Sequence, residues 1–222
     1  MRERIKTGVP GLDDILNGGI PKGSFVLLSG VAGSGKTTLA SQFLYEGLKN
    51  NERCVFISFE ETPQLIKESM MDFGFDFGLY EKKGTMSFIK YDTYNTEGLF
   101  DVVESTIRNM KADRVVIDSI SVIGLNMKNK AEFRRVILNL SNIMRKLGVT
   151  CIAISEIVPG KHLISRYGVE EFVSDGVIVL YYERKDNKFL RNIQVFKMRG
   201  DDHSKDLHRY DITPKGIVVS KT

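Results

Sequence analysis

Apolar residues gather in short runs along the chain, and most runs are separated by stretches whose apolar positions recur at helical spacing. Runs with strand character lie at residues 24–28, 54–59, 86–91, 114–119 and 149–154. Helices are predicted over residues 38–49, 62–73 and 96–110, from a polar loop at 126–130 to about residue 147, and as a short turn at 10–16. Strands that alternate with helices predict crossover connections and a mostly parallel sheet, and continuously apolar strands predict that both faces are covered.

The pattern changes after residue 174. Apolar runs at 175–183, 190–197 and 217–220 follow one another with turns and without helices between them. We therefore expect these runs to be antiparallel strands at one edge of the sheet. The chain has no internal repeat, low-complexity tract or linker, which predicts a single α/β domain over residues 1–222, with helices flanking the sheet.

Composition narrows the class of protein. Of the 222 residues, 42% are hydrophobic and 27% are charged, as in soluble globular proteins. The N-terminus is charged and no apolar run approaches a membrane span, so we expect a cytoplasmic protein without a membrane segment. Cys54 and Cys151 lie in apolar runs and are expected to be buried free thiols. The net charge of +4 allows contact with nucleic acid without requiring it.

Residues 30–37 read G-x-x-x-x-G-K-[ST], the phosphate-binding loop of nucleotide hydrolases. Gly33 and Gly35 lack a Cβ, so the backbone amides can approach phosphate oxygens closely. Lys36 reaches the outer phosphates, and the Thr37 hydroxyl is a ligand for Mg²⁺, which prefers oxygen. A strand before the loop and a helix after it argue against an incidental glycine-rich turn. The expected phosphate-binding set is Gly33, Ser34, Gly35, Lys36, Thr37 and Thr38.

Carboxylates end two of the predicted strands. Asp118 follows an apolar strand downstream of the loop, where nucleotide hydrolases place the residue that holds Mg²⁺, although a turn or capping aspartate has the same pattern. Glu60 and Glu61 end the neighbouring strand, and either carboxylate can polarise the attacking water. An acidic turn before a helix is the alternative for this pair. The pattern does not decide which of the two glutamates acts.

Lys197, Arg199 and His203 follow an apolar strand near the C-terminus. Two cations two residues apart suit an arginine finger that completes a phosphate site on a neighbouring subunit. Spacing alone favours the simpler interpretation, an exposed basic turn.

Four segments together resemble the KaiC family, the circadian-clock branch of the RecA-like ATPases. They are residues 7–13 (TGVPGLD), the phosphate loop, residues 59–62 (FEET) and residues 197–203 (KMRGDDH). The resemblance implies a RecA-type core and a hexameric ring with ATP between subunits. It also implies catalytic roles for the Glu60–Glu61 pair and contacts from Lys197, Arg199 and His203 to the next subunit's nucleotide.

The chain departs from the clock protein of that family in two ways. It has one ATPase copy where the clock protein has two in tandem. Glu171 and Phe172 stand at the positions of the phosphorylated Ser-Thr pair, and neither side chain can accept phosphate, so self-phosphorylation is not expected. A regulatory or signalling ATPase with an unidentified protein partner is the function that the resemblance favours.

Two other functions stay open. The segments 126–130 and 159–167 carry four Lys or Arg residues, a His and a Tyr, a mixture that suits single-stranded nucleic acid, although solvated loops or subunit contacts explain it as well. The first alternative is therefore a RecA- or RadA-like protein that binds single-stranded DNA with ATP. The second is an ATP-sensing module with little turnover that switches its affinity for a protein partner.

Overall fold

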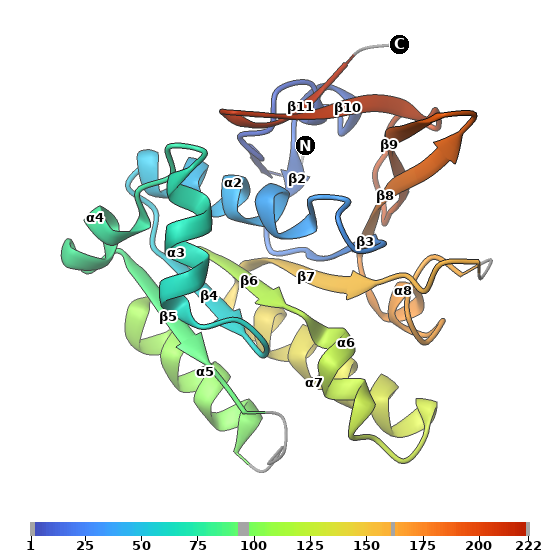
Figure 1. The fold of residues 1–222 in the computed structure, drawn as a ribbon. Helices are drawn as coiled ribbons and strands as arrows, with labels where there is room; N and C mark the ends of the chain where they lie inside the picture. Colours follow the sequence, from blue (N-terminus) through green and yellow to red (C-terminus); the bar gives the residue numbers. More distant parts are fainter. Residues whose placement is uncertain (1–2, 93–97, 161–162, 221–222) are drawn as a thin grey trace.

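The computed structural model describes residues 3–92, 98–160 and 163–220, and a nine-stranded sheet runs through this part of the chain (Figure 1). The strand order is β11-β10-β9-β8-β3-β7-β6-β4-β5. Neighbours from β8 to β5 are parallel, whereas β9, β10 and β11 pair antiparallel. The strands are β3 (Phe25–Gly30), β4 (Cys54–Ser58), β5 (Met86–Lys90), β6 (Arg114–Asp118), β7 (Thr150–Glu156), β8 (Gly176–Lys185), β9 (Lys188–Met198), β10 (His208–Thr213) and β11 (Gly216–Val219).

Helices cover both faces of this sheet. The helices are α1 (Leu12–Ile15), α2 (Lys36–Lys49), α3 (Pro63–Met71), α4 (Phe77–Lys82), α5 (Leu99–Met110), α6 (Ile120–Leu125), α7 (Lys130–Leu147) and α8 (Glu170–Val173). Figure 1 shows α2 and α3 on one face and α5 and α7 on the other. Alternate residues of β3 follow this division, since Val26 and Leu28 pack with α2 while Phe25 and Leu27 pack with α7.

Most of the elements predicted from the sequence are confirmed, with shifts of a few residues at their ends. Helix α2 begins at Lys36, two residues earlier than predicted, with Gly35 as its N-cap. Thr62 caps α3 as its sequence predicts, because its side chain accepts a hydrogen bond from the Leu65 amide at 3.4 Å. The predicted start of α5 at residue 96 lies outside the described residues.

The prediction for the strand at 175–183 was wrong in one respect. We expected an antiparallel strand, but β8 pairs in parallel with β3, and the antiparallel part begins only at β9. The short α8 lies directly before β8, so the chain enters β8 from the same edge of the sheet as β3. The sequence analysis also missed α4, α6, β10 and a small sheet of β1 (Arg4–Ile5) and β2 (Ile20–Pro21), which are short.

The cysteine prediction is confirmed. Cys54 and Cys151 are both free and buried, and burial raises the pKa of both thiols. No helix within the described ranges combines the length and the apolar character that a membrane crossing needs.

Candidate functional site

The phosphate-binding loop joins β3 to α2, and its backbone depends on glycine. Gly33 and Gly35 have φ angles of +77° and +91°, in the left-handed region that favours glycine. A Cβ on Gly30 would lie 2.5 Å from the Ser34 Oγ, too close for a real contact. Tyr210, fully buried on β10, donates a hydrogen bond to the Ser34 carbonyl at 2.6 Å. Strand β10 thus fixes the position of the phosphate loop through this hydrogen bond.

Lys36 lies in the first turn of α2, and its ammonium group points back to the loop. The Nζ donates to the Val31 carbonyl at 3.0 Å. Burial lowers the pKa of Lys36, while the carboxylates of Asp118, Glu156 and Glu60 act in the opposite direction. A partly desolvated cation that is held by one carbonyl has donors left for an incoming anion.

The structure brings Thr37 and Asp118 together, although 81 residues separate them in the sequence. The Thr37 Oγ1 donates to the Asp118 Oδ2 at 2.8 Å. Burial raises the pKa of Asp118 to about 6, against the effects of the Thr37 hydrogen bond and of Lys36. The peptide bond between Asp118 and Ser119 is cis. A desolvated carboxylate next to a hydroxyl is a site where a cation would replace lost hydration.

These residues fit Mg²⁺ by their chemistry. Both offer oxygen, which Mg²⁺ prefers, and Mg²⁺ binds through one or two protein ligands together with phosphate oxygens and water. The hydroxyls of Ser34 and Ser119 are buried and have no hydrogen-bond partner among the described residues, so polar atoms near the loop remain to be satisfied. Within the described ranges, no group of three or more His, Cys, Asp or Glu side chains is arranged to hold a metal ion, and a site of this type does not need one.

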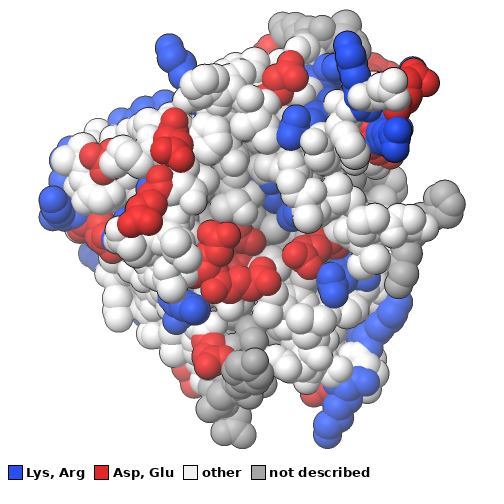
Figure 2. Space-filling view, viewed as in Figure 1, with Lys and Arg blue, Asp and Glu red and all other residues white. Residues whose placement is uncertain are grey.

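A pocket of about 440 Å³ opens at the carboxyl edge of the parallel strands and has an acidic wall. Figure 2 shows acidic side chains gathered on this face of the molecule. Burial raises the pKa of Glu60, and the negative charges of Glu156 and Glu61 raise it further. The pocket is lined by Lys36, Thr37, Ser58, Glu60, Glu61, Leu65, Ile66, Asp118, Ser119 and Glu156. Lys36 and Thr37 of the predicted loop therefore share one cavity with Asp118 and with the Glu60–Glu61 pair.

The sequence analysis did not propose Glu156 as a site residue. It ends β7, which lies between β3 and β6 in the sheet, and its carboxylate pairs with Arg166 at 2.9 Å. The Ser121 hydroxyl accepts a hydrogen bond from the Glu156 amide at 2.8 Å and fixes the end of the strand. A carboxylate at the end of an apolar strand is the signal that identified Asp118, and it was present here as well.

The remaining predicted site residues lie at the opposite edge of the sheet. Met198, at the end of β9, pairs with Gly176 at the start of β8, whereas the phosphate loop follows the end of β3, where Gly30 pairs with Leu180. The six residues of β3 span about 20 Å. The structure therefore does not bring the turn at residues 197–203 to the pocket of its own chain.

Within the chain, the two cations of this turn bind the backbone around α8. The Lys197 Nζ donates to the carbonyls of Glu171 at 2.8 Å and Ser174 at 2.7 Å, and burial lowers its pKa. The Arg199 Nη2 donates to the Phe172 carbonyl at 2.9 Å, yet 52% of its side chain stays exposed. The His203 Nδ1 lies 2.8 Å from the Ser204 carbonyl oxygen.

The two segments considered for nucleic acid are engaged in contacts of their own. Tyr167 donates a hydrogen bond to the Ser121 carbonyl at 3.1 Å, and its ring packs 4.6 Å from that of Phe133. Arg166 is paired with Glu156, and Lys161 and His162 lie outside the described residues. Tyr167 is therefore partly buried against the core, which makes its ring less accessible for stacking with bases.

Comparison with known proteins agrees with this architecture. A family model described as "ATPase: KaiC" matches residues 5–222. Circadian clock protein KaiC3 of Synechocystis is 38% identical over 98% of this chain, which spans 45% of KaiC3, about half its length. UPF0273 protein PH0284 of Pyrococcus horikoshii is 38% identical over 99% of this chain and 94% of its own length.

A solved structure gives the same answer for the fold. The crystal structure of KaiC-like protein PH0186 from Pyrococcus horikoshii OT3 matches over 100% of both chains, with a TM-score of 0.91 and 38% identity. The predicted α/β fold of RecA type is thereby confirmed, with its mostly parallel sheet and antiparallel edge strands. From the family match and these relatives together, the chain belongs to the KaiC family of ATPases.

Proposed function

We propose that this chain hydrolyses ATP with Mg²⁺ at the interfaces of a hexameric ring of identical subunits, so that each site needs two subunits. The meeting of Lys36, Thr37, Asp118 and the Glu60–Glu61 pair in one pocket carries the proposal. Residues 1–222 form a single ATPase domain, and the hexameric ring acts as a regulatory or signalling protein in the cytoplasm.

Each residue type has a defined task in this mechanism. The amides of residues 33–38 bind phosphate oxygens at the start of α2, where the helix dipole favours anions, and Lys36 binds the outer phosphates. Thr37 and Asp118 hold Mg²⁺, which supplies charge neutralisation on the phosphates. Glu60 orients the attacking water, because its carboxylate lines the pocket and its raised pKa makes it a stronger proton acceptor than an ordinary carboxylate.

The turn at residues 197–203 acts on the nucleotide of the next subunit. Its position at the far edge of the sheet, with Arg199 half exposed, supports a role in trans. An acidic pocket at one edge and a cationic turn at the other suit a head-to-tail contact between copies, which closes into a ring when the rotation allows. Lys197, Arg199 and His203 then neutralise charge that develops on the transferred phosphoryl group.

Steady-state ATP turnover tests this function, with Lys36→Ala as the inactive reference and with single-stranded DNA added at two salt concentrations. We expect turnover that requires Mg²⁺, is lost in Lys36→Ala and is indifferent to DNA. Stimulation by DNA that fades with salt would instead support the RecA- or RadA-like alternative. Tight ATP binding without turnover would support the ATP-sensing module. A Glu60→Gln variant should lose more turnover than Glu61→Gln, and the reverse order would exchange their roles.

A further inference from the structure

The N-terminal segment, residues 4–19, lies against the turn at residues 197–203 and against Ser204, which follows it. The Arg4 Nη2 donates to the Asp201 Oδ1 at 2.5 Å, and only 24% of the Arg4 side chain and 15% of the Asp201 side chain are exposed. The Arg4 Nη1 donates to the carbonyls of Leu16 at 2.8 Å and Gly19 at 3.1 Å. The Nη1 of the guanidinium is thus bound to backbone carbonyls, and its Nη2 binds the Asp201 carboxylate in the turn.

Two glycines make this arrangement possible. Gly19 has a φ of +123°, and a Cβ there would lie 2.3 Å from the Ile5 carbonyl oxygen. A Cβ on Gly18 would lie 3.3 Å from the Arg4 Cδ. The backbone therefore closes on the arginine stem only because both positions are glycine.

Two further bonds connect the same segment to the same turn. The Asn17 Nδ2 donates to the Asp202 carbonyl at 3.1 Å, and the Ser204 amide donates to the Ile15 carbonyl at 2.9 Å. Inside the turn, the Asp201 amide reaches the Met198 carbonyl at 3.4 Å, a long hydrogen bond. Contacts from the N-terminal segment thus lie between Arg199 and His203, at residues 201 and 202, and directly after His203, at residue 204.

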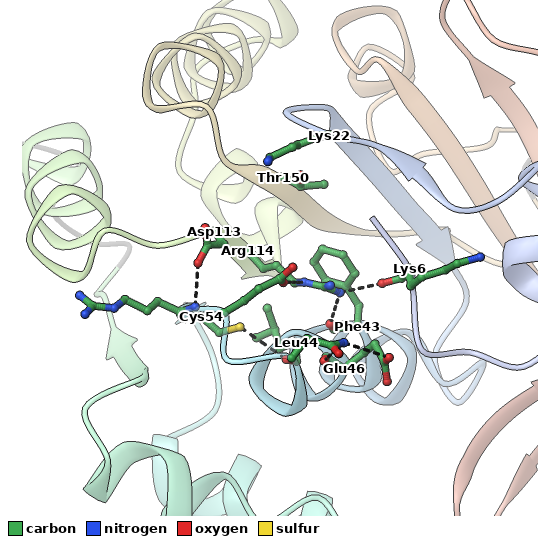
Figure 3. A network of polar contacts seen from close by, with 12 residues as sticks. Lys6, Lys22, Phe43, Leu44, Glu46, Cys54, Asp113, Arg114 and Thr150 are labelled. Atoms are coloured by element: carbon green, nitrogen blue, oxygen red, sulfur yellow. Dashed lines mark hydrogen bonds and ion pairs between the residues drawn. The ribbon is translucent and has the colours of Figure 1, made fainter. Parts of the chain in front are cut away.

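The segment itself is anchored on the helix that follows the phosphate loop. Arg114, 2% exposed, donates to the Lys6 carbonyl at 2.7 Å and to the Phe43 carbonyl of α2 at 2.8 Å (Figure 3). Gln42 of α2 donates to the Gly8 carbonyl at 2.8 Å. The segment is therefore a fixed part of the structure and can hold the turn in place.

We propose that Arg4, supported by Asn17, is a positioning residue that sets the geometry of the turn bearing Arg199 and His203. This inference rests on the proposed function, in which the turn acts on the next subunit's nucleotide. A cation that stabilises a transition state must be placed to within a fraction of an ångström, and a displacement of about 1 Å can cost about 100-fold in rate. Loss of Arg4 removes the ion pair that anchors Asp201, while the pocket of the same subunit is unchanged.

The test uses full-length Arg4→Ala, Asp201→Asn and, as a matched control, Lys22→Ala. Lys22 pairs with Glu3 at 2.9 Å directly beside the small sheet of β1 and β2, and the described structure records no contact between Lys22 and the turn. We expect Arg4→Ala to lower kcat about 10- to 100-fold with little change in KM for ATP, because the transition state is affected more than binding. Asp201→Asn should act in the same direction with a smaller loss, and Lys22→Ala should match wild type.

Mixed assemblies separate positioning from general damage. Arg4→Ala subunits are mixed in equal amounts with subunits carrying Glu60→Gln and Glu61→Gln, whose turn is intact. Where an intact pocket of the first meets the intact turn of the second, a complete site forms, so random rings should recover about a quarter of wild-type turnover. Arg199→Ala, mixed in the same way, should be rescued equally.

Each outcome decides a different question. Rescue of Arg199→Ala without rescue of Arg4→Ala would overturn the positioning role and leave the proposed function standing. No rescue of Arg199→Ala would count against the shared site itself. If Arg4→Ala does not fold, the milder Asp201→Asn carries the same test, and wild-type turnover in that variant would overturn the inference.

Discussion

The two edges of the parallel sheet carry different chemistry. At the carboxyl edge, Lys36, Thr37 and Asp118 contact one another or share a pocket, and three glutamates line the same cavity. At the amino edge, Lys197 and Arg199 bind only backbone carbonyls and Asp175, and the described structure records no phosphate loop beside them. The residues of the carboxyl edge form one pocket within the chain. The cations of the amino edge have no phosphate-binding loop beside them in the described part of the same chain.

Under the proposed function, the residues of one reaction lie at two edges of the chain that never meet within one subunit. Strand β3 alone spans about 20 Å between the two edges. A small movement therefore cannot bring the turn at residues 197–203 to the pocket of the same chain. In the proposed ring, two copies placed head to tail would bring the edges together without any change of fold. In the proposed mechanism, activity therefore depends on the contact between subunits.

The largest effect on this difference between the two edges is expected from Arg199→Ala. We expect kcat to fall about 1,000-fold, because an arginine that reaches a phosphoryl group in trans contributes at least that much in related enzymes. Arg145→Ala is the matched control, since Arg145 pairs with the same Asp175 at 2.8 Å from helix α7. Steady-state ATP turnover of both variants gives the answer.

An equal loss in Arg145→Ala would contradict the trans role. It would mean that Arg199 matters through Asp175 and the backbone of α8 within its own chain. A loss confined to Arg199→Ala, with an unchanged melting temperature, supports the contact with the next subunit.

In the absence of Mg²⁺ and nucleotide, Asp118→Asn should raise the unfolding free energy of the protein at pH 7.5. The same substitution should abolish ATP turnover. The pKa of Asp118 is raised from 3.8 to about 6, so the folded state favours the protonated carboxyl. Its contribution to stability is complete below pH 4 and is lost as the pH rises through 6. Asparagine cannot ionise and can still accept the Thr37 hydrogen bond, so the variant should gain up to about 3 kcal/mol in unfolding free energy.

Chemical unfolding at pH 4.5 and pH 7.5 measures this effect. The two proteins should differ less at the lower pH, where the wild-type carboxyl is largely protonated. With Mg²⁺ and ATP the order should reverse, because only the wild type gains stability from the bound ligand. An asparagine variant with the wild-type dependence on pH would show that Asp118 is not desolvated in solution.

The sequence predicted the carboxyl edge better than the amino edge, for a physical reason. The phosphate loop is local, since its glycines, lysine and threonine lie within eight residues and each is required by backbone geometry or charge. The contact between Thr37 and Asp118 follows from one rule, that parallel strands end at the same edge. Glu156 obeys the same rule and was overlooked.

The amino edge depends on contacts that no local pattern encodes. Arg4 and Asp201 are 197 positions apart, and Arg4 lies in none of the segments that carry the family resemblance. The direction of β8 was also beyond the apolar pattern, because alternation marks a strand but not the edge from which it starts. The packing of Tyr167 against Phe133, 34 positions away in the sequence, is likewise a contact that no local pattern encodes.

The smallest predicted effect concerns Glu156, the charged neighbour of the candidate base. Its negative charge helps to raise the pKa of Glu60, and its partner Arg166 lowers that pKa. Glu156→Gln removes the first effect and frees Arg166 for the second, so both changes lower the pKa of Glu60. If Glu60 accepts a proton or orients water as a carboxylate, turnover is lost as the pH falls through its pKa, and the variant should lose it at a lower pH.

The pH dependence of kcat measures this shift, with Glu81→Gln as the control. Glu81 also forms an ion pair, at 2.8 Å with Lys67, but it does not line the pocket. The control should leave the acidic limb of the profile where it is in the wild type. An acidic limb that does not move in Glu156→Gln, or that moves to higher pH, would assign that limb to another group. A shift to lower pH would instead mean that the charge of Glu156 helps to set the pKa of Glu60, so that the acidic wall of the pocket tunes the residue that acts on water.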